Sequence, residues 1–346
     1  MRRWASSIAL ILLGLGIFAG LVYFSNPRLI WEELKAVGGL GFLAVVGDVV
    51  LGFFAWTLSW FLLLRGAGIK VRWRRVLSPM LAGSAVTYLT PSAYLGGEPV
   101  RAYWVAKETG VSMAHVMAPT MVERLLGGVS LLVFAAIGGF FALLSPTTSL
   151  ATKGAIALGL GVMTVLLLLG IISFAFDLQW LSRALKALGR VIRWRGILTR
   201  LAGSASVMEE HIYQLLSHRL GHVLGSFIMQ LVTVFLTYIQ PQIFFYFAKQ
   251  MLFNFVQLSL FFTLNVFISA FVWLTPGGIG LADGGLAGVF QLLGLPLSSA
   301  LAYDVLFRFV GLIQVGLGIY VLLRRGLLSW RFGRISVEVE EKDKSK

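Results

Sequence analysis

The chain has 346 residues, of which 58% are hydrophobic and only 13% charged, and its mean hydropathy is +0.86. Its net charge of +14 does not indicate nucleic-acid binding, because the basic residues sit in loops between apolar runs, as membrane topology and anionic headgroups require. The sequence has no cysteine, which excludes disulfides, iron–sulfur clusters and thiolate zinc sites.

The apolar runs predict an all-α polytopic membrane protein with about six full spans and two short, broken hairpins. A helix needs roughly 20 apolar residues to cross a bilayer. The predicted spans are 5–24, 41–64, 121–144, 154–176, 221–246 and 300–323. The first run is too long for a signal peptide and lacks a small-residue cleavage site, so we expect it to be retained.

Two other apolar runs are interrupted by the same pattern. In each, Thr-Pro is followed by small residues and then by a carboxylate eight positions after the threonine. Proline and glycine end a helix, and broken helices in matching places indicate a transporter's binding site. The residues are Thr90, Pro91, Gly96, Gly97 and Glu98 in the first break, and Thr275, Pro276, Gly277, Gly278, Gly280 and Asp283 in the second.

A lone arginine inside an apolar run follows each break. Arg124 comes 34 residues after Thr90, and Arg308 comes 33 residues after Thr275. We expect these arginines either to clamp a phosphate or to form internal salt bridges to Glu123 and Asp304. For Glu98 and Asp283, helix capping and a substrate or proton role both stay open.

The basic residues also predict the topology. With both termini cytoplasmic, four basic residues lie outside (Arg28, Lys35, Lys153 and Lys249), two lie in spans, and the other 23 of the 29 lie inside. The first hairpin then opens to the cytoplasm and the second to the outside, which makes the repeats inverted. Residues 251–274 could alternatively cross fully.

This topology divides the chain into a membrane domain and a tail. The membrane domain covers 1–325, with repeats at about 76–144 and 255–323, and 326–346 form a charged cytoplasmic tail. Residues 177–200 alternate leucines with basic residues at helical spacing, which predicts an amphipathic helix at the inner membrane surface.

Combined, these motifs resemble the transmembrane region of lysylphosphatidylglycerol synthase, the flippase part of that enzyme, and its stand-alone relatives. The matching residues are Thr90-Pro91, Gly96-Gly97-Glu98, Arg101, Glu123-Arg124, Thr275-Pro276-Gly277-Gly278, Gly280 and Asp283. The resemblance covers about residues 5–325 and implies a cell-membrane protein that moves or handles lipids. The aminoacyl-transferase module of that enzyme has no counterpart in this sequence, so we do not expect lysyl transfer.

The sequence predicts no catalytic residue, metal site or cofactor. It holds no phosphate-binding Walker loop and no HExxH motif, and the His218–His222 pair lacks a clear third ligand. The expected partners are membrane lipids with anionic headgroups. A homo-oligomer and a lipid-pathway glycosyltransferase stay open as partners.

Three functions therefore remain: a lipid translocase, an integral-membrane enzyme that modifies lipids, and a non-transporting scaffold for a glycolipid pathway. Inverted repeats favour the first. The candidate substrate-binding residues are those of the two breaks together with Arg101, Glu123, Arg124, Asp304 and Arg308.

Overall fold

The computed structural model describes residues 20–23, 26–90, 96–144, 150–176, 178–191, 195–271 and 280–324. Over these residues the secondary structure is entirely helical, which confirms the predicted all-α fold. Within these described ranges, five helices are long and apolar enough to cross a membrane. They are α2 (Pro27–Gly66), α5 (Met113–Leu144), α6 (Leu150–Ala175), α9 (Leu220–Lys249) and α12 (Leu297–Arg324). The sixth predicted span, 5–24, lies almost wholly outside the described residues.

Helix α2 begins earlier than the sequence indicates. The predicted spans 5–24 and 41–64 leave 25–40 between them as an external connector that carries Arg28 and Lys35, yet this segment is helical from Pro27. The Asn26 side chain accepts a hydrogen bond from the Arg28 amide at 3.2 Å, and proline suits the first helical position. At Gly38 the backbone leaves helical geometry with φ of 65°, which glycine tolerates and other residues rarely adopt. A kink in a longer helix therefore replaces the expected loop.

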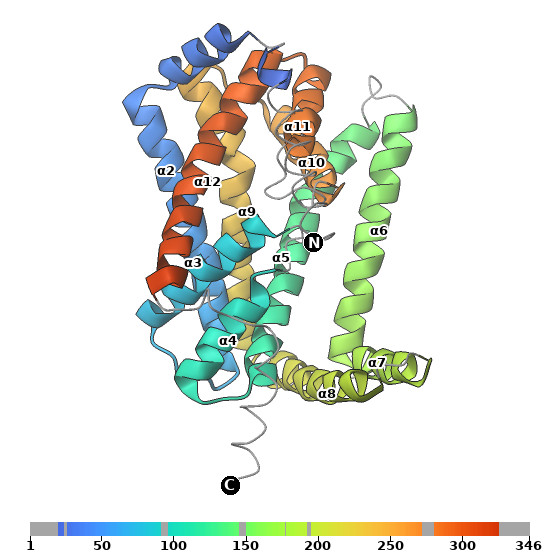
Figure 1. Cartoon of the computed structure of the whole chain (residues 1–346). Coiled ribbons are helices and arrows are strands. Elements are labelled where there is room, and N and C mark those ends of the chain that lie inside the picture. Colours follow the sequence, from blue (N-terminus) through green and yellow to red (C-terminus); the bar gives the residue numbers. More distant parts are fainter. Residues whose placement is uncertain are drawn as a thin grey trace.

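Two pairs of shorter helices form the hairpins. The first pair is α3 (Trp73–Leu89) and α4 (Glu98–Thr109), and the second is α10 (Phe255–Phe271) and α11 (Leu281–Leu292). In each pair the first helix has 17 residues and the second has 12, which correspond to lengths of about 25 and 18 Å. Both lengths are less than the roughly 30 Å thickness of a bilayer core. The pairs occupy opposite halves of the bundle (Figure 1). Helix α10 is therefore shorter than the full span considered for 251–274, as the hairpin alternative requires.

Each hairpin packs against the long helix that follows the other hairpin. Helix α12 contacts α3 so closely that a Cβ atom on Gly318 would lie 2.2 Å from the carbonyl oxygen of Leu81. Helix α5 contacts α10 in the same way, where a Cβ on Gly138 would lie 2.0 Å from the carbonyl oxygen of Ser259. Since α5 also contacts α4, and α12 contacts α11, each of these two long helices joins both hairpins.

The predicted amphipathic segment 177–200 is two helices, α7 (Trp180–Val191) and α8 (Arg195–His218). They lie across the lower end of the bundle (Figure 1), where the α2–α3 connection also lies. The buried Glu209 carboxylate of α8 accepts hydrogen bonds from the amides of Leu181 and Ser182, at 2.9 and 3.4 Å. Glu209 thereby supplies acceptors to the free amides of the first turn of α7. We call this end of the molecule the basic end, after Arg65, Lys70, Arg72, Arg74, Arg75, Arg183, Lys186, Arg200 and Arg219.

Candidate functional site

The first cluster of charges lies where α4 begins. Glu98 is the first residue of α4, is 1% exposed, and forms an ion pair with Arg124 of α5. A carboxylate in the first turn of a helix is stabilised by the helix dipole. The α4 start approaches α3 closely, since a Cβ on Gly97 would lie 2.0 Å from the carbonyl oxygen of Gly83. Gly97 is needed here for close packing, and its amide donates to the Thr87 hydroxyl at 3.0 Å.

A second ion pair lies beside the first and joins the same two helices, with the arginine on α4 and the carboxylate on α5. Arg101, three residues after Glu98 on the same face of α4, pairs with Glu123, the neighbour of Arg124 on α5. Both side chains are almost completely buried. Glu123 also accepts hydrogen bonds from the Trp56 indole at 2.6 Å and the Gln230 amide at 2.8 Å. The Arg101 guanidinium lies 4.8 Å from the centre of the Trp60 ring, within range of a cation–π contact.

The equivalent cluster of the second repeat lies where α11 begins. Asp283, in the first turn of α11, accepts a hydrogen bond from the Gly280 amide at 2.7 Å and pairs with Arg308 of α12. The φ of Gly280 is 84°, in the region that favours glycine. The Arg308 Nε also donates to the Asp304 carboxylate at 3.1 Å. Capping by Asp283, one of the two roles left open by the sequence, is therefore present.

The expected internal partner of Arg124 was wrong. Glu123 pairs with Arg101, and Arg124 pairs with Glu98. For Arg308 the expected partner Asp304 is present, and Asp283 is a second one. Both repeats thus share one feature, a carboxylate at the restart of the hairpin paired with the arginine of the next long helix.

The three arginines differ in exposure. The Arg101 side chain is 3% exposed, whereas Arg124 and Arg308 are 31% and 16% exposed. Solvent or a ligand can therefore approach Arg124 and Arg308 but not Arg101. Arg308 also lies on the helix that packs against α3, so the second cluster and a contact with the first hairpin share α12.

Several predicted site residues lie beside these clusters or outside the described residues. Thr90 ends α3, and its hydroxyl donates to the carbonyl of Val86 at 2.7 Å. Gly96 precedes Gly97 in the bend before α4. Pro91, Thr275, Pro276, Gly277 and Gly278 lie outside the described residues.

Sequence reasoning missed two sets of residues, one around the first cluster and one at the basic end. Trp56 and Gln230 come from α2 and α9, far from the breaks in sequence, and no motif indicated that they bind Glu123. His211 stacks on His115 with ring centres 4.1 Å apart, although His218 and His222 were the histidines considered for a metal. Among the described residues, no group of three or more His, Cys, Asp or Glu is placed to hold a metal ion.

The sequence profile of the lysylphosphatidylglycerol synthase TM region matches residues 11–318, nearly the whole chain. The chain belongs to this family. Two archaeal proteins with similar sequences are UPF0104 membrane proteins. The protein PH1989 of Pyrococcus horikoshii is 26% identical over 290 residues, which are 79% of this chain and 84% of that one.

The second relative comes from Methanothermobacter thermautotrophicus and is 33% identical over 117 residues, or 33% of this chain. That match spans about a third of the relative's length (34%). The names of both relatives describe a membrane protein and give no activity. Family membership and the five long helices together establish an integral membrane protein of the lysylphosphatidylglycerol synthase TM family.

Proposed function

We propose that this protein moves an anionic phospholipid, glycophospholipid or polyprenyl-phosphate lipid between the leaflets of the cell membrane, without chemically changing it. The observation that carries the proposal is the repeated pair of carboxylate and arginine, Glu98–Arg124 and Asp283–Arg308, one pair at each hairpin. Ionisable side chains inside a membrane protein are costly and mark function by default. Their occurrence at both opposed hairpins suits a cycle in which the site faces each leaflet in turn.

In this proposal the lipid phosphate competes with a carboxylate for the guanidinium. A planar guanidinium binds phosphate and carboxylate by the same paired hydrogen bonds, so one can replace the other. The partly exposed Arg124 and Arg308 are placed for such an exchange. Arg101, buried with Glu123, holds α4 on α5 and does not meet the lipid.

The test is a headgroup-accessibility assay with fluorescent phosphatidylglycerol in proteoliposomes. Arg124→Lys keeps the positive charge but loses the planar guanidinium that donates two parallel hydrogen bonds to phosphate. We therefore expect lipid flux to be at least about tenfold slower, equivalent to a rise of roughly 1.4 kcal/mol in the activation free energy. Arg28→Lys, an exposed arginine in a surface pair with Glu32, is the matched control and should leave flux unchanged.

The charge-neutral variant Glu98→Gln with Arg124→Gln separates a structural pair from a ligand site. If the pair only holds the hairpin, this variant folds and transports. If Arg124 binds phosphate, it folds but does not transport. Wild-type flux in the double variant overturns the phosphate-binding role.

The same liposomes separate the other function classes. Labelled lipid that changes leaflet with unchanged mass supports a translocase. A change in the mass of the lipid supports a lipid-modifying enzyme, and neither change supports a scaffold. We place the basic end in the cytoplasm, because loops rich in lysine and arginine stay on that side, and the same rule applied to the sequence predicts that both termini are cytoplasmic.

A further inference from the structure

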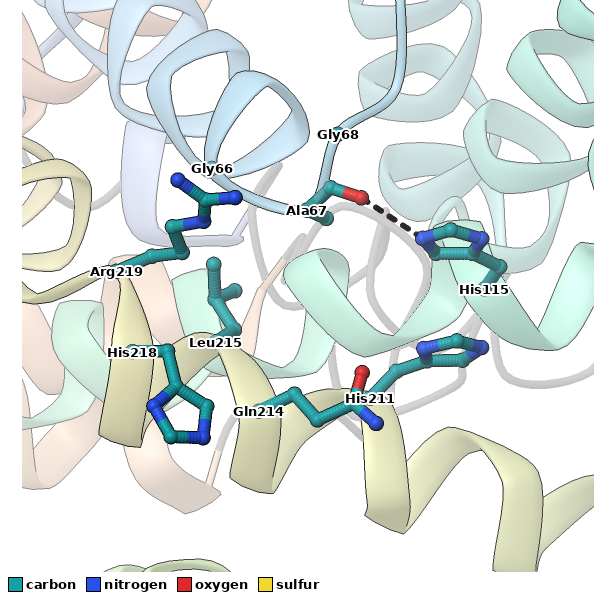
Figure 2. A pocket seen from close by; sticks show the side chains of 9 residues that line it. All are labelled: Gly66, Ala67, Gly68, His115, His211, Gln214, Leu215, His218 and Arg219. Atoms are coloured by element: carbon teal, nitrogen blue, oxygen red, sulfur yellow. Dashed lines mark hydrogen bonds between the residues drawn. The ribbon is translucent and has the colours of Figure 1, made fainter.

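A pocket of about 360 Å³ lies at the basic end, away from both ion-pair clusters. Its walls come from the turn after α2, the start of α5, the end of α8 and the connection to α9 (Figure 2). This volume is within the range of small-ligand sites. Three histidines, an arginine and a glutamine supply its polar lining. We call it the histidine pocket, and it is lined by Gly66, Ala67, Gly68, His115, His211, Gln214, Leu215, His218 and Arg219.

The turn after α2 gives the pocket its shape. The φ of Gly68 is 77°, which favours glycine, and the turn leaves the Ala67 carbonyl directed at His115, whose Nε2 lies 2.9 Å from that oxygen. A Cβ on Gly66 would lie 2.9 Å from both Leu215 and His222, so glycine lets α8 and α9 approach the end of α2. The shape of this pocket wall therefore depends on glycine at two positions, Gly66 and Gly68.

The side chains that face the pocket are mostly hydrogen-bond donors. His211 lies parallel to His115 at one end of the pocket, with 9° between the ring planes, while His218 and Arg219 lie at the other end (Figure 2). The Arg219 guanidinium donates in every protonation state, and an imidazole donates from both nitrogens once it is protonated, so this lining can supply donors to a phosphate. The opposing charge nearby is Glu210, which accepts from Gln214 at 3.3 Å and so lies beside the pocket wall.

We propose that the histidine pocket binds a phosphate group, and that protonation of His211 accompanies binding. This site is separate from the one at the hairpins, and it stands whether or not the protein moves lipid. The phosphate can belong to a lipid headgroup or to a free anion. The exposed Leu220 and Leu224, which follow Arg219 on α9, give a lipid tail an apolar surface beside the pocket.

Protonation is part of the proposal because the surroundings of His211 disfavour its charged form. Burial, and then the neighbouring His115, hold the pKa of His211 below its usual range. A bound phosphate would reverse this effect, since an opposite charge favours the protonated imidazole. Binding should therefore take up a proton and tighten as pH falls. The titratable and charged groups around His211 are His115 of α5, Glu210 and His218 of α8, and Arg219 before α9.

The experiment uses the full chain in phosphatidylcholine nanodiscs and isothermal titration calorimetry at pH 6 and pH 8. The probes are inorganic phosphate, sulfate and short-chain phosphatidic acid. Sulfate keeps its charge between these pH values, so tighter sulfate binding at pH 6 reports the histidines. Repeating the titration in buffers of different ionisation enthalpy measures proton uptake.

Arg219→Gln and His211→Asn test the lining, and Arg200→Gln is the matched control, an exposed arginine of α8 that does not line the pocket. Loss of one charged hydrogen bond should weaken binding about tenfold or more in the first variant. His211→Asn should abolish the pH dependence, and Arg200→Gln should change neither. Unaltered thermal unfolding temperatures show that the variants fold.

Each result decides the proposal. Binding of phosphatidic acid alone assigns a lipid phosphate, and binding of all three anions assigns the phosphate group in general. No binding of any probe, an equal loss in Arg219→Gln and Arg200→Gln, or equal sulfate affinity at the two pH values overturns it.

Discussion

At the scale of single residues, the Arg101–Glu123 pair distinguishes structural charge from ligand-binding charge. It is buried, and Trp56, Gln230 and the Trp60 ring surround it. Removing one member of a buried pair leaves the other without a counter-charge, at a cost of about 3–5 kcal/mol. We therefore expect Arg101→Met alone to lower the unfolding temperature in detergent strongly.

The double variant Arg101→Met with Glu123→Gln should recover most of that stability. Glutamine retains an oxygen that accepts from Trp56 and Gln230, and it leaves no buried charge. Equal instability of the single and double variants would show that the charges themselves are needed. Transport should survive in the double variant, unlike in Glu98→Gln with Arg124→Gln.

At the scale of helices, the close contact at Gly318 can be tested by comparing two glycine-to-alanine variants of α12. Gly318→Ala places a methyl group 2.2 Å from the Leu81 carbonyl oxygen, which forces α12 away from α3. Overpacking of this kind costs about 1–3 kcal/mol. Gly311→Ala, on the same helix with no atom within 4 Å of the added Cβ, is the control. We expect only Gly318→Ala to lower the unfolding temperature and slow flux.

The contact between α7 and α8 gives a second helix-scale prediction. Glu209→Ala removes the acceptors for Leu181 and Ser182, which should cost about 1 kcal/mol, as for a lost helix cap. Helix α7 should then loosen, giving faster tryptic cleavage at Arg183 and Lys186. Glu210→Ala removes the same charge one residue further along, and cleavage at the wild-type rate is expected there.

The sequence predicted helices better than it predicted the contacts between them. Thr-Pro and the glycines act locally on the backbone, so the break after Leu89 and the restarts at Glu98 and Leu281 could be found from spacing alone. The partners of Arg124 and Arg308 depend on how α4 and α11 rotate against the next helix, which no local pattern specifies. The stack of His115 on His211 joins segments that only the bundle brings together.

At the scale of the whole molecule, the two ends of the bundle should label from opposite sides of the membrane. The sequence has no cysteine, so introduced ones react without background. Leu252 is 62% exposed between α9 and α10, and Ser217 is exposed at the end of α8.

We expect an impermeant maleimide to label Leu252→Cys in intact cells and Ser217→Cys only after lysis. Labelling of both positions in intact cells would contradict the proposed topology. Labelling of Ser217→Cys alone would place the basic end outside and reverse the direction assigned to each hairpin.

The shortness of the hairpins has an electrical consequence. Each hairpin reaches only partway from its own end of the bundle, so Glu98 and Asp283, in the first turns of α4 and α11, lie in the interior. We therefore expect the membrane potential to drop across a shorter thickness of protein than in a bundle made only of full spans. In the proposed function, an anionic headgroup passes between the hairpins and carries its charge through that field, where one elementary charge is worth about 2.3 kcal/mol per 100 mV. A potassium gradient with valinomycin should then speed or slow the flux of phosphatidylglycerol according to its sign. Flux of a zwitterionic lipid through the same protein should not respond to voltage.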